Sequence, residues 1–197
     1  MSSAEVEFPV FMSKFRQTFI EVFQHRVNGS VDFYRNFSSY EAGFGSPSGE
    51  FWLGLSLMHE MTSRTTNELR IDIQRANGGL GYVVYPKFRI EAAPTYILRI
   101  GTKTDYGGIT SAAADYLTQT NDGGAVNMAF STFDRDNDLR SGSNCASSYH
   151  GAWWYNDCYQ YANLNGEYLT PGTDSSSSMS FDKHVSLKTS RMMFRTT

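Results

Sequence analysis

The sequence predicts a single α+β domain, and three observations lead to this fold class. The chain has 197 residues, of which 40% are hydrophobic and 19% charged, so it has the size and composition of one globular domain. Segments with the alternating pattern of half-buried strands are interspersed with segments of helical spacing. The two kinds of segment do not alternate with βαβ regularity, and we find neither an internal repeat nor a linker, so an α/β fold is not expected.

The first strands are expected near the N-terminus. Residues 18–27 are predicted as a strand, and Asn28-Gly29 as a tight turn, because both positions tolerate positive φ. Residues 31–37 are expected to return as the second strand of this hairpin, before a Gly-rich loop over residues 40–48.

A helix and a half-buried strand are expected next. Residues 50–62 are predicted as a helix because apolar residues recur there at helical spacing. Residues 68–75 are predicted as a strand because Leu69, Ile71 and Ile73 alternate with polar residues.

The remaining elements are short. After a turn at residues 77–79, we expect strands at 81–90 and 96–100, a helical turn at 112–114, a short strand at 130–132, a Ser-rich loop at 175–178 and a final strand at 185–195.

The acidic stretch near residue 136 is the most informative part of the chain. Asp134, Asp136 and Asp138 place three carboxylates on alternate residues, which repel one another unless a cation neutralises them or water separates them. Calcium binds several oxygen ligands at once, so such a loop can hold it. An EF-hand is excluded, because Leu139 and Cys145 occupy the positions that need Gly and Glu. A solvated acidic turn remains the alternative.

The only two cysteines, Cys145 and Cys158, follow this stretch. Their placement as a pair favours a disulfide and an oxidising compartment. The alternatives are free thiols of a cytosolic protein and ligands of a zinc ion, but zinc needs partner histidines and only His150 lies nearby. Trp153 and Trp154 lie between the cysteines, where core positions are favoured over a ligand platform.

Charge and hydropathy argue against several kinds of partner. The net charge of −3, without a basic run, argues against nucleic acid and anionic membranes. No apolar run reaches the ~18 residues of a membrane span. The N-terminal residues lack the features of a signal peptide, whereas glycosylation sequons at Asn28 and Asn36 are compatible with secretion. We interpret the chain as a secreted, extracellular domain whose upstream region is absent.

Catalysis is not expected. The four histidines are dispersed, and His59-Glu60 lacks the second histidine of a zinc-protease helix. No nucleophile–base or acid–base pair is visible, so we predict a binding protein and not an enzyme.

Nine short motifs follow one another along the chain. They are Asn28-Gly-Ser-Val-Asp-Phe-Tyr-Arg, Tyr40-Glu-Ala-Gly-Phe-Gly, Gly49-Glu-Phe-Trp-Leu-Gly, Phe130-Ser-Thr, Asp134-Arg-Asp-Asn-Asp, Asn144-Cys-Ala, Gly151-Ala-Trp-Trp-Tyr, Cys158 and Asn163-Leu-Asn-Gly. In these motifs the chain resembles the fibrinogen C-terminal domain of fibrinogens, ficolins, tachylectin-like lectins, tenascins and angiopoietins. The resemblance covers about residues 18–196.

The resemblance implies a fold and a calcium site. The fold would be a twisted antiparallel sheet with short helices and a loop-rich C-terminal portion that carries the binding pocket. Calcium would be bound by the carboxylates of Asp136 and Asp138, with backbone carbonyls from near Ser141 and Ser143. The two cysteines would be bonded to each other.

The resemblance also implies a ligand pocket, which takes acetyl groups of sugars in ficolin-like lectins. Tyr149 would form one aromatic wall, and the backbone at Cys158 and Tyr159 would supply hydrogen bonds. The peptide between Asp157 and Cys158 would be cis, as is frequent in the family.

Several positions depart from the family pattern. The family usually carries a second cysteine pair near the N-terminus, and residues 7–16 have none. We therefore expect an atypical N-terminal segment, residues 1–17, before a fibrinogen C-terminal-like domain, residues 18–197. Tyr159 stands where ficolin-like lectins have histidine, and Phe181 stands where a tryptophan is expected.

The leading functional hypothesis is a calcium-dependent extracellular recognition module, a lectin that binds acetylated glycans in innate immunity. The alternatives are an adhesion or receptor-binding module that contacts cell-surface proteins, and a truncated isoform without binding. We expect homo-oligomers formed through an upstream region that is not present here.

Overall fold

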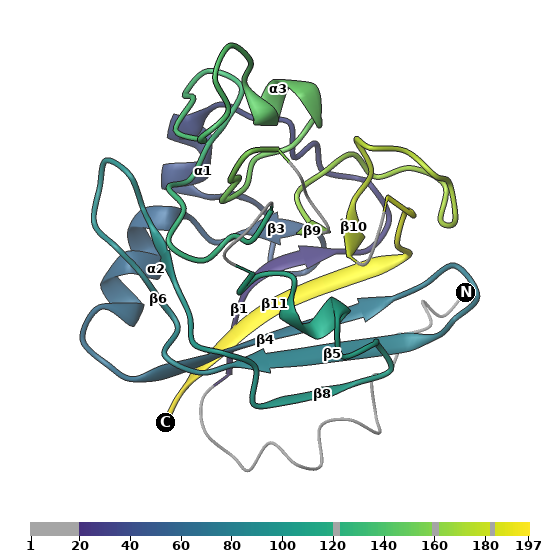
Figure 1. Ribbon diagram of the computed structural model, residues 1–197, viewed down its shortest axis with the longest axis horizontal. Helices are drawn as coiled ribbons and strands as arrows, with labels where there is room; N and C mark the ends of the chain where they lie inside the picture. Colours follow the sequence, from purple (N-terminus) through teal and green to yellow (C-terminus); the bar gives the residue numbers. More distant parts are fainter. Residues whose placement is uncertain (1–19, 120–122, 159–161, 182–183) are drawn as a thin grey trace.

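A seven-stranded antiparallel sheet organises the fold (Figure 1). The computed structural model describes residues 20–119, 123–158, 162–181 and 184–197. The strand order β2-β3-β1-β11-β4-β5-β8 places the N-terminal strand β1 (Ile20–Arg26) beside the C-terminal strand β11 (Thr189–Thr196). Short helices occur between the strands, so the predicted α+β class is confirmed.

The other elements are short, and the strands carry most of the regular structure. The remaining strands of the main sheet are β2 (Phe44–Gly45), β3 (Phe51–Trp52), β4 (Asn67–Gln74), β5 (Leu80–Tyr85) and β8 (Asp105–Gly107). Two small sheets pair β6 (Arg89–Ile90) with β7 (Leu98–Arg99), and β9 (Ala162–Asn163) with β10 (Ser180–Phe181). The helices are α1 (Phe37–Ala42), α2 (Leu55–Thr62), the 3-10 turn η2 (Ala113–Asp115) and α3 (Cys145–Ser148). Among the described residues, no helix has the length and apolarity to cross a bilayer.

The centre of the sheet follows directly from the alternation of apolar residues. Leu69, Ile71 and Ile73 of β4 are at most 1% exposed, because alternate side chains of a strand share one face. Ile71 lies opposite Met192 of β11 and Val83 of β5. The strand predicted over residues 68–75 is therefore confirmed, with its ends shifted by one residue.

The predicted hairpin after β1 is wrong. Residues 31–36 form no strand, and β1 pairs with β11 and β3 instead. The backbone amides at the turn donate hydrogen bonds to the carboxylate of the buried Glu50; the donors are Val27, Asn28, Gly29 and Val31. Because a side chain satisfies these amides, no returning strand is needed to pair them.

Other elements differ from the prediction too, among them the strand expected over residues 81–90, which divides into β5 and β6. Helix α1 begins in the segment expected to be a strand and extends into the expected loop, because Asn36 caps its first turn. The helix predicted over residues 50–62 divides into β3 and α2 at Gly54, whose φ of 110° interrupts a helix. The last strand begins at Thr189 and not at residue 185.

Aromatic rings fill the core above the sheet. The side chains of Tyr40, Trp52, Phe130 and Trp154 are each at most 1% exposed. The ring of Phe130 lies 5.0 Å from that of Trp154 and 5.8 Å from that of Trp52. Trp153 is 2% exposed and packs against Trp154 at 5.3 Å. The core interpretation of Trp153 and Trp154 is confirmed, and neither is a ligand platform.

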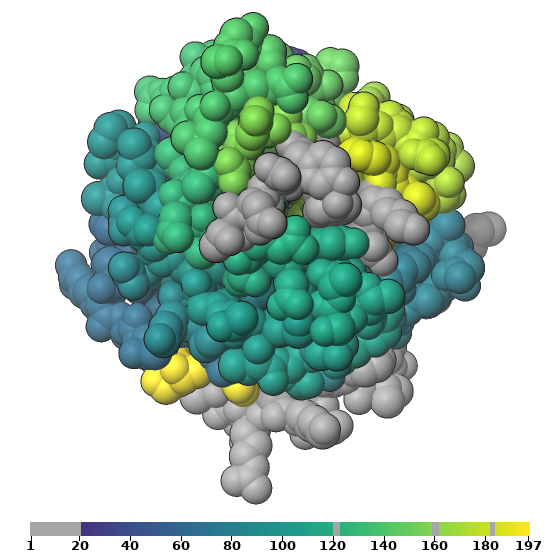
Figure 2. All heavy atoms as spheres, viewed as in Figure 1, coloured from purple at the N-terminus to yellow at the C-terminus, as the bar shows by residue number. Residues whose placement is uncertain are grey.

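Residues 130–158 and 162–181, here called the loop region, contain little regular structure. In Figure 2 the green residues of its first half project at the top of the view, away from the teal residues of β5 and β8. The buried Arg26 of β1 joins this region to the sheet. The guanidinium of Arg26 lies 3.9 Å from Glu50 and donates to the carbonyl oxygens of Leu164 at 3.3 Å and Gly166 at 2.8 Å.

Candidate calcium and ligand site

The acidic stretch is a loop whose two ends are fixed by backbone pairing. Ser131 N donates to the carbonyl of Trp153 at 2.9 Å, and Trp153 N donates back to Ser131 at 3.1 Å. Further along, Leu139 N donates to the carbonyl of Asn156 at 2.8 Å. The loop therefore lies across the chain that leads to the second cysteine.

The carboxylate of Asp138 is held in place by backbone donors. Its Oδ2 accepts from Cys145 N at 2.8 Å and its Oδ1 from Arg140 N at 2.9 Å. Its own amide donates to Asp136 Oδ1 at 3.3 Å. Burial, and after it the adjacent carboxylate of Asp136, together raise the pKa of Asp138 to about 6, against the lowering effect of the backbone hydrogen bonds. Two carboxylates placed this closely favour a proton or a cation between them.

The oxygen atoms in and near Asp138 are suitable ligands for a calcium ion. A carboxylate oxygen that accepts one amide keeps a second lone pair for a cation. Ser141 and Ser143 lie in the exposed part of the same loop. Within the described part of the chain, neither of their carbonyls accepts a hydrogen bond from the backbone. Carboxylates, carbonyls and water form the all-oxygen set that calcium prefers.

The third carboxylate of the acidic stretch has a structural role. Asp134 Oδ1 accepts from Phe37 N at 2.9 Å and from the hydroxyl of Thr132 at 2.6 Å. It therefore ties the loop to α1, and the fit to calcium depends on Asp136 and Asp138.

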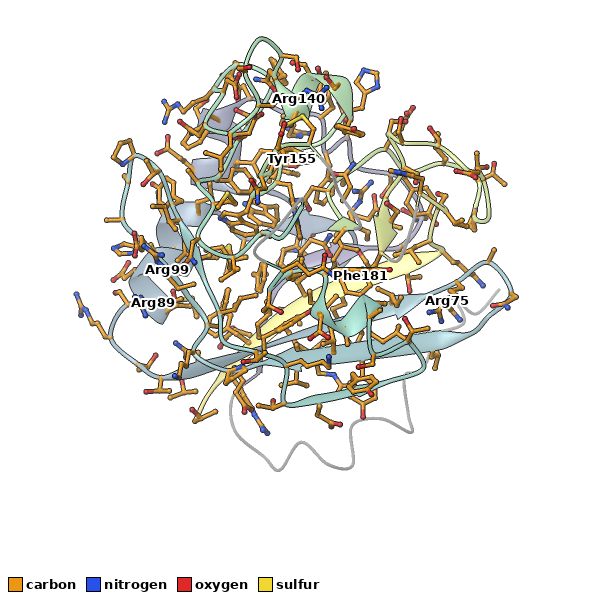
Figure 3. The ribbon with its side chains drawn as sticks, viewed as in Figure 1. Arg75, Arg89, Arg99, Arg140, Tyr155 and Phe181 are labelled. Atoms are coloured by element: carbon orange, nitrogen blue, oxygen red, sulfur yellow. A yellow bond between two sulfur atoms is a disulfide. The ribbon has the colours of Figure 1, made fainter. Side chains whose placement is uncertain are left out.

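The predicted disulfide between Cys145 and Cys158 is confirmed. The two Cα atoms are 5.1 Å apart, and both side chains are at most 2% exposed. Both sulfurs lie close to the carboxylate of Asp138. Since bonded sulfurs are not thiolate ligands, a zinc site built on these cysteines is excluded. In the view of Figure 3, the sulfur–sulfur bond lies between Arg140 in the acidic loop and the buried Tyr155.

The disulfide brings two of the predicted pocket residues to the same part of the fold. Tyr149 directly follows α3, is half-buried, and its ring lies 6.4 Å from that of Tyr155. Cys158 is buried and has a φ of 56°, in the left-handed region. Asp157 is exposed, and Tyr159 lies outside the described residues. The Asp157–Cys158 peptide is not cis, so that prediction was wrong.

Sequence reasoning gave no role to Asn163, which supports this pocket from the protein interior. Its Nδ2 donates to the carbonyl of Tyr149 at 3.1 Å, and its Oδ1 accepts from the hydroxyl of Tyr155 at 2.8 Å. It is fully buried in β9. An asparagine between the apolar residues Ala162 and Leu164 is the one sequence signal that could have identified it.

The two sequons and Phe181 have different surroundings. Asn28 and Asn36 are both exposed, but Asn36 Oδ1 is engaged as the N-cap of α1. Phe181, at the position where a tryptophan was expected, is 2% exposed in β10, and its ring lies 6.5 Å from that of Tyr116.

Comparisons with known proteins agree with this fold. The family model of the fibrinogen beta and gamma chains, C-terminal globular domain, matches residues 12–197. Tenascin of Gallus gallus is 45% identical over 148 residues, which is 75% of this chain and 7% of tenascin. The chain spans between 7% and 31% of the length of the curated relatives it matches.

Solved structures agree in fold over most of the chain. The fibrinogen-like globe domain of human ANGPTL2 has a TM-score of 0.80 and 32% identity, and the match covers 90% of this chain and 80% of that one. Lamprey fibrin D-dimer, complexed with the peptide Gly-His-Arg-Pro-amide, has a TM-score of 0.76 and 29% identity, with 91% and 62% covered. The chain therefore belongs to the family of fibrinogen C-terminal globular domains.

Proposed function

We propose that this domain is an extracellular recognition module that binds a compact acetylated group, as found on glycans, in a calcium-dependent manner. The observation that carries the proposal is the position of the paired carboxylates. Asp138 accepts a hydrogen bond from Cys145 N, and Cys145 is bonded to Cys158 beside Tyr149. A cation held by the carboxylates would therefore act on the same residues that border the pocket.

Different residues of the site would have different roles in binding. Bound calcium would supply positive charge that removes the repulsion between Asp136 and Asp138. Asp138 would then keep its hydrogen bond to the first turn of α3, which positions Tyr149. The ring of Tyr149 would offer an apolar face to a methyl group, and its orientation is supported by Asn163 through the backbone carbonyl.

Affinity at one such site is expected to be low. Tyr149 is the one aromatic side chain proposed here as a pocket wall, so little apolar area closes over a ligand, and a dissociation constant near 1 mM corresponds to only about −4 kcal/mol. Several copies presented together would raise the effective affinity without any new contact. Homo-oligomers formed through residues upstream of the domain would supply these copies.

A second candidate function is recognition of a protein surface. One member of the family with a solved structure, lamprey fibrin, is in complex with a short peptide. A peptide uses the same kind of pocket, because a few placed polar groups and one aromatic wall suffice for either ligand. Neither candidate function requires catalysis, and no role as an enzyme is proposed.

The test is retention of the multimerised domain on a resin that carries N-acetylglucosamine. We expect retention with calcium, elution by free acetylated compounds, and loss of retention with a chelator. Tyr149→Ala should abolish retention without lowering the melting temperature by more than a few degrees, because the side chain is only half-buried. Tyr106→Ala is the matched control, since Tyr106 is 40% exposed on β8 in the sheet.

Three outcomes have different meanings. Binding to a peptide column in place of the sugar resin would favour the protein-recognition function. Retention that is unaffected by both the chelator and Tyr149→Ala would contradict the proposed site. Absence of retention on either column would indicate an isoform without binding.

A further inference from the structure

A groove separate from the candidate site lies between residues 29–34 and residues 166–168, with His150 among its lining residues. Its volume of about 480 Å³ falls within the range of small-molecule sites, ~300–1,000 Å³. Neither Tyr149 nor Cys158 lines it. In Figure 1 the first of these segments is drawn in purple, after β1, and the second in yellow-green, before β10, because they lie far apart in the sequence.

The two walls of the groove are fixed to each other. A Cβ atom added to Gly29 would lie 2.8 Å from Cδ1 of Tyr168, so the two segments already touch. The hydroxyl of Tyr168 lies 2.9 Å from the carbonyl of Val27 and 2.8 Å from that of Lys188. Because these contacts fix the two walls relative to each other, a ligand would bind without first ordering them.

One wall carries an aromatic cluster. Tyr34 lines the groove, and its ring lies 4.8 Å from that of Phe133 and 4.8 Å from that of His150. Phe133 and His150 thus both pack on Tyr34 from other parts of the chain, and Phe133 is 38% exposed. Packing of this kind limits the rotamers of Tyr34 and makes it a fixed apolar surface.

Two carboxylates lie at the rim. Asp32 Oδ1 accepts from Tyr34 N at 2.8 Å, and Glu167 Oε2 accepts from the hydroxyl of Ser177 at 3.0 Å. Both side chains are exposed, and each carboxylate keeps lone pairs for further donors. The groove therefore combines a fixed aromatic surface with hydrogen-bond acceptors of negative charge, which disfavour an anion.

We infer that this groove is a second binding site, for a neutral pyranose ring. A pyranose presents C–H bonds on one face, which pack on an aromatic ring, and hydroxyl groups at its edge, which donate to carboxylates. Neither Asp136 nor Asp138 lines this groove, and its test needs no calcium, so the inference goes beyond the proposed function. Acidic sugars such as sialic acid should not bind there, since Asp32 and Glu167 would repel their carboxylate.

The experiment is saturation-transfer NMR on the whole chain, with calcium removed by a chelator. The probes are methyl glycosides of glucose, mannose, galactose and N-acetylglucosamine, with N-acetylneuraminic acid as the anionic comparison. The protein is produced without N-glycans, because Asn28 borders the groove at Gly29. We expect at least one neutral pyranose to give a signal, in wild type and in Asp138→Ala alike, and the acidic sugar to give none.

Two variants locate the signal in the groove. Glu167→Gln keeps the shape of the side chain and should weaken binding about tenfold through the loss of a charge-assisted hydrogen bond. Tyr34→Ala should weaken it at least as much, and Tyr106→Ala on β8 should leave it unchanged. Melting curves that match wild type for Glu167→Gln separate a binding effect from misfolding.

The proposal is overturned if no neutral pyranose gives a signal, or if Glu167→Gln binds as wild type does. A lysine-rich peptide that binds where every pyranose fails would assign the groove to cationic ligands instead. Since all measurements are made without calcium, failure of the acetyl-group site leaves this result unaffected.

Discussion

The sheet and the loop region achieve order in different ways. In the sheet, β11 and β4 pair over eight consecutive positions without a shift in register, and main-chain hydrogen bonds satisfy the backbone. In the loop region, side chains satisfy the backbone one group at a time. Asn163 donates to Tyr149 O, Asn144 donates to Thr132 O, and Asn165 donates to Ala152 O.

The difference explains where the binding residues lie. Most side chains of β4, β5 and β11 are buried, and close packing leaves few of these positions free to vary. A loop that is cross-linked by a disulfide and by buried asparagines keeps its shape while its exposed residues change. Both proposed sites accordingly use residues between Gly29 and Tyr34 or between Phe133 and Tyr168, outside the main sheet.

The largest effect is expected where the two regions meet. Glu50 is 1% exposed, accepts from four backbone amides and lies 3.9 Å from the buried guanidinium of Arg26. Glu50→Gln removes the charge that compensates Arg26 and turns one acceptor into a donor. We expect a loss of about 3–5 kcal/mol in the free energy of unfolding, measured by urea denaturation.

A surface ion pair provides the control for that measurement. Glu91→Gln breaks a pair with Arg99 in which both side chains are about one-third exposed, at 33% and 32%. Its effect should not exceed about 1 kcal/mol. Equal losses in the two variants would contradict the view that Glu50 stabilises the buried Arg26 where the two regions meet.

A smaller effect is expected from removal of the disulfide. The bond closes a loop with a sequence separation of 13 residues, and a loop of this size is worth about 3 kcal/mol. The double variant Cys145→Ser with Cys158→Ser should therefore be less stable by about that amount. Hydrogen exchange should show that amides of residues 131–158 lose protection first, while those of β4 and β11 keep it.

Uniform loss of protection across both regions in the disulfide variant would show that the loop region and the sheet unfold as one unit. That outcome would remove the distinction drawn between them.

The smallest effect is a difference in pH response between the two regions. Burial acts to raise the pKa of Glu50, but its backbone hydrogen bonds outweigh burial and hold the pKa below its usual value of 4.5. Glu50 therefore contributes stability at pH above that value, and the contribution is lost as the pH falls through its lower folded pKa.

The carboxyl of Asp138 has the opposite effect on the pH dependence of stability. Its pKa rises from 3.8 to about 6, chiefly through burial, so the folded state holds the proton more tightly. Without calcium, this carboxyl should make the protein less stable as the pH rises from about 4 to about 6. The melting temperature of wild type minus that of Asp138→Asn should fall across this window. A constant difference would contradict the assignment.

Calcium should reverse this contribution at neutral pH. An ion that binds the folded state raises the melting temperature with its concentration. The increase should shrink as the pH falls below about 6, because a proton on Asp138 competes with the ion.

The sequence alone was sufficient where structure depends on local periodicity. The alternation of Leu69, Ile71 and Ile73 placed β4, since side chains two residues apart share a face whatever the strand pairs with. The pairing of Cys145 with Cys158 was equally accessible, because the chain offers no other partner. The family could be identified from motifs whose order along the chain is fixed.

Only the tertiary structure decided the features that depend on distant partners. Nothing near Asn28 indicates that Glu50 takes its amide and prevents a hairpin, and nothing near Tyr149 indicates that Asn163 holds its carbonyl. A groove between residues 29–34 and 166–168 is likewise invisible along the chain. The physical reason is that a buried polar group must find a partner wherever the fold places one, and that choice is made in space and not in sequence.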